Sequence, residues 1–377
     1  MDHKYFNSYM ESNRTYLKEN YIAIQKHIGE NVKVIPVLKD DGYGFGDIEA
    51  ARCMLEVGAE IIAVAQVCEG MRMRDEGINI PILVLGGNPV HTLPYLVKYD
   101  LQAIVFTKEN AEQLDAEAKK QGKIAEVHIK LDTGMHRVGV QVGKPLADFL
   151  EILKTLKNIK VVGTFTHFAT SDNYNDPFTL EQLDKFRQGI RQIQADGSFE
   201  LKYIHCRNSC GTVWVKDEYS THVRPAALLL GYGRMGDGSS PVPVKETLSL
   251  RSFITMIKEV PVGETVGYGR FFKPEKPTMV ATVSLGYGDG LFRPLAMACH
   301  GPVLVNDTLC HYVGLCMDQL FIDVTGVDCK VGDEITVFGY SRNGTFLSAY
   351  DVAAACGTTF HTLITSPTRR VGREFVD

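Results

Sequence analysis

The stretch that decides the fold is VKVIPVLKDDGYGFGDIEAARCMLEVGAEIIAVA, residues 32–65. Its first part, Val32–Leu38, is apolar and rich in β-branched residues, which is typical of a buried strand. Asp47–Val57 then has its apolar residues at helical spacing, and a second apolar run follows at Glu60–Ala65. A strand, a helix and a strand in this order predict a parallel βαβ unit.

The same alternation continues along the chain after a polar, helix-like stretch at residues 1–30. Further strands are predicted at Pro81–Leu85, Leu101–Phe106, Ala125–Leu131, Lys160–Phe165, Leu201–His205 and Val223–Leu230. Helical patterns separate most of them, at Lys108–Gln121, Pro145–Lys157 and Leu180–Ala195. Eight strands in about 235 residues match a (β/α)8 TIM-type barrel. A doubly wound sheet is the alternative, but it would normally have fewer strands and a phosphate fingerprint after the first.

The pattern changes after Asp237, where Gly238–Pro243 (GSSPVP) has the composition of a linker. The remaining chain is turn-rich, with predicted strands at Ser249–Val260, Thr278–Leu285, Pro302–Val305, Gln319–Thr325 and Asp333–Phe338 and one helical patch at Ser348–Cys356. We therefore predict two domains: an α/β barrel over residues 1–240 and a mainly-β domain over residues 241–377.

Composition excludes several classes of protein. The 377 residues carry a formal net charge of −5, which argues against a nucleic-acid binder, and no run approaches the ~18 apolar residues that a membrane span needs. No signal peptide is visible, and nine cysteines without a CxxC pair indicate reduced thiols in a cytoplasmic protein. Cys206 and Cys210 lack a second ligand pair, so no metal site is expected. Gly231–Gly236 matches GxGxxG, but the residues after it cannot open a helix, so no dinucleotide site is expected either.

Polar side chains follow the predicted strands where catalytic residues lie in such barrels. Lys39 follows the first strand, Lys130 and Arg137 come with the fifth, His167 follows the sixth, and Arg224 begins the eighth. Each has a structural alternative: an end cap for Lys39, a core histidine for His167, a surface ion pair for either arginine. Lys130 is less ordinary, because a lysine inside an apolar strand needs a partner or a modification. Their joint placement favours a functional site.

These residues lie in motifs that resemble the alanine racemase family. VLKDDGYGFG around Lys39 resembles the pyridoxal-phosphate (PLP) lysine motif of that family, and the further matches come in the family's order. They are HIKLDTGMHRVG (128–139), THFA (166–169), HCRNS (205–209), VRP (223–225), VGYG (266–269), GYGDG (286–290) and CMDQ (316–319). The matches span nearly the whole chain, and their ordered set is specific. The family fold is a (β/α)8 barrel followed by a β domain.

The resemblance implies a PLP-dependent amino-acid racemase with a role for each matched residue. Lys39 would bind the cofactor covalently and act as one catalytic base, and Tyr268 from the partner chain of a head-to-tail homodimer would be the other. The remaining implied cofactor contacts are Tyr43, His167, Asn208, Ser209, Arg224, Ala226 and Ala227. Arg137 and Met317 would bind the substrate carboxylate, Tyr287 would line the entrance, and Lys130 matches a lysine that is carbamylated in many members. Alanine is the expected substrate, as a source of D-alanine for peptidoglycan.

Departures from the family pattern leave the substrate open. The family's residues after the lysine become Asp40-Asp41-Gly42, an entry-corridor arginine after Gly314 is missing, and Arg369 stands where we align a pocket-narrowing tyrosine. A racemase of serine or of a longer or polar amino acid is therefore an alternative. A PLP decarboxylase of the same fold type is a second alternative, which the motifs Gly267-Tyr268-Gly269 and CMDQ (316–319) disfavour. A non-catalytic PLP carrier is a third, which the retention of both Lys39 and Tyr268 disfavours.

Overall fold

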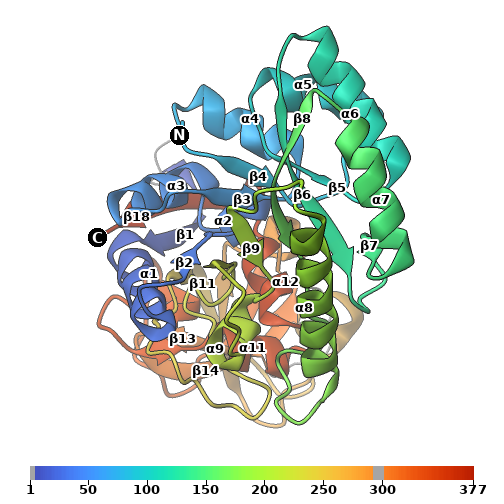
Figure 1. Ribbon diagram of the computed structural model, residues 1–377. Helices are drawn as coiled ribbons and strands as arrows, with labels where there is room; N and C mark the ends of the chain where they lie inside the picture. The colour runs from blue at the N-terminus through green and yellow to red at the C-terminus, as the bar shows by residue number, and fades with distance from the viewer. Residues whose placement is uncertain (1–4, 292–300) are drawn as a thin grey trace. The chain divides into compact units, whose positions relative to one another are not determined.

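The computed structural model describes residues 5–291 and 301–377 (Figure 1). They fall into two compact units. A barrel unit comprises Leu17–Gly42 and Asp47–Lys245, and a β unit comprises the chain up to Tyr16, the short loop Tyr43–Gly46 and Glu246–Asp377. The predicted boundary, with residues 1–240 in one domain and residues 241–377 in the other, stays a prediction.

The barrel unit is a closed ring of parallel strands, eight within the described residues. They are β2 (Lys33–Val34), β3 (Ile62–Val64), β4 (Ile82–Val84), β5 (Ala103–Val105), β6 (Ala125–Asp132), β8 (Ile159–Phe165), β9 (Tyr203–His205) and β10 (His222–Val223). Single parallel bridges, Val37 with Ala63 and Leu83 with Gln102, join neighbouring pairs of strands, and Thr221 N donates to Ile204 O at 2.9 Å beside β9 and β10. The predicted TIM-type barrel is confirmed, with a short β7 (Val140–Gln141) pairing on β6.

Helices connect the barrel strands, and Figure 1 shows α5 to α8 outside the strands. Their bounds are α3 (Asp47–Glu56), α4 (Val67–Asp75), the 3-10 turn η2 (Val90–Thr92), α5 (Leu93–Lys98), α6 (Lys108–Lys120), α7 (Lys144–Thr155), α8 (Phe178–Asp196) and α9 (Ser209–Trp214). Apolar residues at helical spacing explain them: α7 buries Leu146, Phe149, Leu150 and Leu153 on one face. Within the described chain, no helix is both long enough and apolar enough to span a bilayer.

Two expectations about the ends of the barrel segment were wrong in detail. The predicted strand Val223–Leu230 is a strand only at His222–Val223, and after Pro225 the chain turns, with Leu229 N donating to Ala226 O at 3.0 Å. The apolar Leu228–Leu230 is buried as a turn, which apolar composition does not distinguish from a strand. The helix-like start of the chain contains a strand, β1 (Ser8–Asn13), before α1 (Arg14–Ile28).

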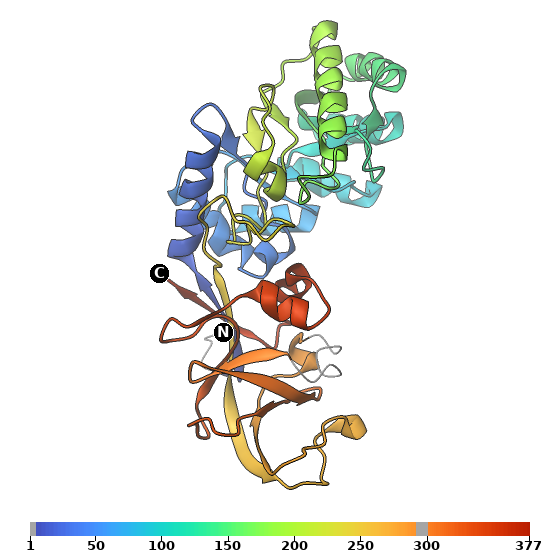
Figure 2. The ribbon, with the colours of Figure 1, turned by 90° about the horizontal axis from the view of Figure 1, so that it is seen from below.

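The β unit is built on a mainly antiparallel sheet. Its strands are β1, β11 (Leu248–Val260), β12 (Thr278–Val283), β13 (Pro302–Val305), β14 (Thr308–Leu315), β15 (Leu320–Asp323), β16 (Glu334–Tyr340), β17 (Phe346–Leu347) and β18 (Gly372–Val376). The long β11 pairs with β12, β16 and β1, so that β11, β12, β15, β14, β13 and β16 close into a ring (Figure 2). Between and after the strands lie the 3-10 turns η3 (Tyr268–Arg270) and η4 (Tyr287–Asp289) and the helices α11 (Ala349–Ala355) and α12 (Phe360–Thr365). The first strand of the chain, β1, thus lies between β11 and the last strand, β18.

Candidate active site

The carboxyl ends of the barrel strands place the predicted basic residues on one rim. Lys39 follows the bridge at Val37, Lys130 stands near the end of β6, His167 follows β8, and Arg224 follows β10. Parallel strands of a barrel all end at the same face, which is where active sites of this fold lie. We call Lys39, Lys130, Arg137, His167 and Arg224 the basic rim.

A left-handed turn, labelled α2 (Lys39–Tyr43), follows the candidate lysine. The φ angles of Asp40, Asp41 and Tyr43 are +54°, +54° and +55°, and that of Gly42 is +65°. Left-handed backbone costs about 1–2 kcal/mol per residue outside glycine, and such strain concentrates at functional sites. Glu69 on α4 holds the turn, because its carboxylate accepts a hydrogen bond from Asp40 N at 2.6 Å. The departure from the family at residues 40–42 therefore keeps residue types that tolerate this geometry.

The side chains of the basic rim lower one another's proton affinity. Burial, and then the Arg137 cation, lower the pKa of the Lys39 amine. Burial, and then Arg224, lower the pKa of Lys130 to about 7. Burial and the surrounding cations, Arg224 first, hold the pKa of His167 well below its usual value, so its ring is neutral at pH 7. The basic rim thus places two amines of lowered pKa, Lys39 and Lys130, near arginine cations.

Arg224 is the most buried member of the rim and has a fixed orientation. It is 3% exposed, and its guanidinium donates to Thr166 O at 2.7 Å, to His205 O at 2.8 Å and to His205 Nδ1 at 2.6 Å. His167 Nδ1 lies 3.4 Å from Nη2. In the part of the chain that the structure describes, no carboxylate contacts Arg224, and burial lowers its pKa to about 10. An arginine at such a site remains a cation at neutral pH.

The start of α9 provides a second set of polar groups in the barrel unit. Asn208 caps this helix by accepting from Gly211 N at 2.9 Å, and it also accepts from Ser171 Oγ at 2.7 Å. Ser209 Oγ accepts from Ala226 N at 2.9 Å and from Leu228 N at 3.3 Å. These bonds join the HCRNS and VRP segments, so Ser209 and Ala226 lie side by side. Ala227, the last predicted contact, is buried.

The β unit carries the remaining predicted residues. Tyr268, in η3 after Gly267 (φ +67°), is 79% exposed, and Met317 is 51% exposed. Two backbone hydrogen bonds join the Tyr287 loop to the Met317 loop: Tyr287 N donates to Cys316 O at 3.1 Å, and Gly288 N donates to Met317 O at 2.8 Å. The predicted entrance residue, Tyr287, and the predicted carboxylate-binding residue, Met317, therefore lie on adjacent loops.

Arg370 reinforces this junction, and the sequence did not single it out. Its guanidinium contacts the buried Asp289 at 3.0 Å and Asp318 at 2.6 Å, one carboxylate from each loop. Its only sequence signal was its place in the RRVGR segment (369–373). Arg369 is exposed, as is Arg370.

The ring beside Tyr43 within the β unit belongs to His361 of α12, at 6.4 Å between centroids. A Cβ on Gly44 would lie 2.2 Å from Ile364 O, so glycine lets this loop approach α12 closely. Within the β unit, an aromatic residue of α12, His361, thus accompanies Tyr43.

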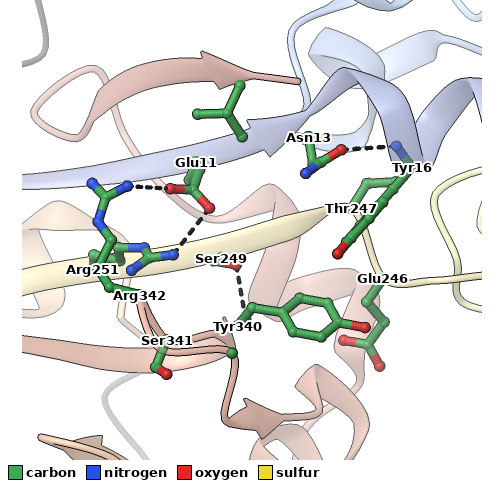
Figure 3. A pocket seen from close by; sticks show the side chains of 12 residues that line it. Glu11, Asn13, Tyr16, Glu246, Thr247, Ser249, Arg251, Tyr340, Ser341 and Arg342 are labelled. Atoms are coloured by element: carbon green, nitrogen blue, oxygen red, sulfur yellow. Dashed lines mark hydrogen bonds and ion pairs between the residues drawn. The ribbon is translucent and has the colours of Figure 1, made fainter.

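A polar hollow of about 270 Å³ lies elsewhere in the β unit (Figure 3). Glu11 in its wall accepts from Arg251 at 3.0 Å and from Arg342 at 2.9 Å. Arg251 also pairs with Glu334 at 2.6 Å, and Arg342 pairs with Glu374 at 3.3 Å. We call Glu11, Arg251, Glu334, Arg342 and Glu374 the arginine–glutamate cluster. Its charges satisfy one another, so this hollow has the character of a structural ion-pair network.

Family models match both parts of the chain. The alanine racemase N-terminal domain matches residues 13–233, and the alanine racemase C-terminal domain matches residues 247–375. The chain belongs to the alanine racemase family. Among curated relatives in this family, the alanine racemase of Clostridium novyi is 33% identical, over 95% of this chain and 93% of its own length. That of Halothermothrix orenii is 35% identical, over 95% and 94%.

Solved structures of alanine racemases share the whole fold. The enzyme of Clostridium difficile 630 superposes with a TM-score of 0.91 at 29% identity, covering 98% of this chain and 95% of its own. The alanine racemase of Bacillus anthracis with bound L-Ala-P also has a TM-score of 0.91, at 28% identity, with 99% and 96% covered. The chain therefore spans both domains of an alanine racemase at nearly full length.

Proposed function

We propose that the protein is a PLP-dependent isomerase that interconverts L- and D-alanine. One observation carries the proposal: the strand-end residues of the motif set form a single basic rim in which Lys39 has a lowered amine pKa. Membership of the alanine racemase family supports the same activity, and the relatives' names favour neither the serine racemase nor the decarboxylase alternative.

The donors of the barrel unit fit PLP. Lys39 provides an amine for the cofactor aldehyde, and the Ser209 segment with Ala226 and Ala227 provides hydroxyl and backbone groups suited to a phosphate. Arg224 provides a fixed cation for the pyridine nitrogen, Asn208 caps the helix that begins at Ser209, and His167 completes the set of the barrel unit. Tyr43, in the β unit's loop Tyr43–Gly46, is a further contact that we propose. Bound PLP withdraws electrons from the substrate α-carbon and so makes its C–H acidic.

Racemisation needs a proton removed from one face of the α-carbon and a proton delivered to the other face. We assign these steps to the Lys39 amine and the Tyr268 hydroxyl, one group on each face. The lowered pKa of Lys39 leaves more of the amine neutral near pH 7, as a base requires. The Arg137 guanidinium and the Met317 backbone N–H would hold the substrate carboxylate, while Tyr287 would line the entrance.

We further propose that Lys130 is carbamylated. The unmodified amine is 4% exposed, donates to Leu131 O at 2.7 Å, and lies near Arg224 and Arg137. A carbamate would replace a buried cation by an anion among these cations. A mass increase of ~44 Da that disappears at acid pH would support this assignment.

A head-to-tail homodimer would complete the active site. Tyr268, Phe271 and Met317 are 79%, 59% and 51% exposed, which is high for large apolar side chains and favours a partner surface there. The cytoplasm, where D-alanine enters peptidoglycan precursors, is the compartment we propose for this activity.

Chiral analysis of L-alanine incubated with protein and PLP tests the activity. We expect D-alanine at equilibrium, no product from Lys39→Ala, and full activity from Lys144→Ala, which removes an exposed lysine of α7. Faster racemisation of serine or of a longer amino acid than of alanine would favour the alternative racemase. Evolved CO2 would favour the decarboxylase alternative. A fully active Lys39→Ala variant would refute the mechanism.

Mixing two inactive variants tests the shared site. Lys39→Ala and Tyr268→Ala homodimers should each be inactive, whereas unfolding and refolding them together should restore ~25% of wild-type activity, because half of the dimers then have one intact site. Tyr268→Phe racemising as fast as wild type would show that the Tyr268 hydroxyl is not the second base.

A further inference from the structure

A chain of hydrogen bonds crosses the interior of the barrel and ends at Arg224. The guanidinium donates to His205 Nδ1 at 2.6 Å, and His205 Nε2 lies 3.0 Å from His128 Nδ1. His128 Nε2 lies 3.0 Å from Gln102 Oε1, and Gln102 Nε2 donates to Glu126 at 2.8 Å. We call Glu126, Gln102, His128, His205 and Arg224 the histidine relay. TIM barrels usually fill this space with branched apolar side chains.

The two ends of the relay force the direction of every bond between them. Arginine only donates, so His205 Nδ1 must accept, and the proton of the neutral ring is on Nε2. His205 therefore donates to His128, which in turn donates from its own Nε2 to Gln102 Oε1. An ionised carboxylate only accepts, so Glu126 independently requires the Gln102 amide group to face it. Both ends thus assign the same tautomers.

The surrounding fold is shaped around the two rings. His205 stacks on Phe165 with centroids 4.8 Å apart, and His128 stacks on Tyr203 at 5.2 Å. A Cβ on Gly163, the residue paired with His128 across β6 and β8, would lie 2.6 Å from His128 Nδ1. Glycine at this strand position makes room for the imidazole. The ionisable groups that face the two rings are His222, Arg224 and Lys130. Burial, and then the Arg224 cation and the neighbouring basic groups, lowers the pKa of both rings.

We propose that Gln102 and Glu126 are positioning residues that orient Arg224 through His128 and His205. Glu126, Gln102 and His128 project from β6 and the start of β5, and alternation along β6 puts Glu126, His128 and Lys130 on one face. Each bond polarises the next, so the Glu126 charge strengthens the acceptor that Arg224 meets, although no carboxylate of the described residues lies against the guanidinium. This inference rests on the proposed function only for its effect on rate, because the tautomers are properties of the protein alone.

Nitrogen NMR of 15N-histidine-labelled protein, prepared without PLP, tests the tautomers directly. We expect His128 and His205 to be neutral with the proton on Nε2 from pH 5 to pH 9. Gln102→Met removes both amide bonds at nearly constant volume and should shift the His128 resonances. Glu126→Gln is the milder second variant, at a half-buried position that tolerates substitution. Glu60→Gln makes the same change at an exposed carboxylate outside the relay and should shift neither ring.

Kinetics and PLP titration of the same variants test positioning. We expect kcat for alanine racemisation to fall about tenfold in Gln102→Met and less in Glu126→Gln, with KM within about twofold, and PLP affinity to fall in parallel. Lys39→Ala abolishes activity without moving the histidine resonances. A proton on Nδ1 of His205, or relay variants with unchanged resonances and unchanged kcat, would overturn the relay. Wild-type protein that racemises no amino acid would overturn the proposed function. The NMR result and the PLP affinity would then still test the histidine relay, because neither measurement depends on racemase activity.

Discussion

Arg224 in the barrel unit and Arg251 in the β unit are equally buried, at 3% and 2% exposed, but they are compensated differently. Arg251 pairs with the carboxylates of Glu11 and Glu334. Arg224 meets carbonyl oxygens and a neutral imidazole instead. A buried cation without a counter-ion costs stability, so its retention indicates that its charge is used, whereas a paired cation indicates a structural role.

The largest expected effect is on the paired arginine. Arg251→Met leaves Glu11 and Glu334, whose side chains are only 12% and 19% exposed, with the half-exposed Arg342 as their remaining counter-ion. It should therefore lower the free energy of unfolding by about 3–5 kcal/mol. Urea denaturation at fixed protein concentration measures this loss. The triple variant with Glu11→Gln and Glu334→Gln is the control and should recover much of it. A loss below about 1 kcal/mol would contradict the structural role by which we distinguish Arg251 from Arg224.

The same substitution in the barrel should act on catalysis. Arg224→Met should lower kcat about 100-fold, or ~2.7 kcal/mol in activation free energy, because the fixed cation is lost. Its unfolding free energy should stay within about 1 kcal/mol of wild type, since the cost of burying an uncompensated charge disappears together with its hydrogen bonds. Alanine racemisation assays and urea denaturation separate the two effects. A variant that loses stability but keeps the wild-type kcat per folded molecule would show that Arg224 is structural.

A smaller, pH-dependent effect should come from Lys130. Its pKa is about 7 in the folded protein and ordinary, near 10.5, in the unfolded chain. Above pH 7 the unfolded chain therefore binds more protons, so stability should rise with pH, by about 2 kcal/mol between pH 7 and pH 9. Denaturation in CO2-free buffers, compared with Lys130→Met, measures this contribution. Equal slopes in the two proteins would contradict it.

The smallest effect should come from the exposed arm of the arginine–glutamate cluster. Arg342 has a side chain that is 51% exposed, although it contacts Glu11 and Glu374. Solvent screens such pairs, so Arg342→Ala should cost only about 0.5–1 kcal/mol, measured as for Arg251→Met. A loss as large as that of Arg251→Met would mean that pairing, rather than burial, sets the energy of this cluster.

Periodicity and strand-end position predicted most of the barrel and the basic rim, because those signals are local. The interval 125–131 has strand character in its own residues, and Lys130 stands out within it because it is a charge in an apolar run. The histidine relay could not be predicted in the same way. Gln102, His128 and His205 meet only through the register of β5, β6, β8 and β9, which no single segment contains.

Long sequence separation also hid parts of the β unit. The segment SYMESN (8–13) is short and polar, and its pairing partners begin at Leu248 and Gly372. Arg370 is one of three arginines in five residues, and only the fold shows which carboxylates it joins. The alignment at Arg369 rested on the adjacent RVGR residues, whereas α12 brings His361 to the Tyr43 loop.

The place of β1 between β11 and β18 has a consequence for synthesis. At 5–20 residues per second, the ~235 residues from β1 to β11 take roughly 10–50 s to emerge, and the barrel segment is complete before β1 has its first partner. β18 begins only at Gly372, roughly 110 residues after β11 ends. A ribosome that stops between β11 and residue 372 therefore releases a protein whose barrel segment is whole but whose β1 has one bare edge, the kind of surface on which unfinished chains associate.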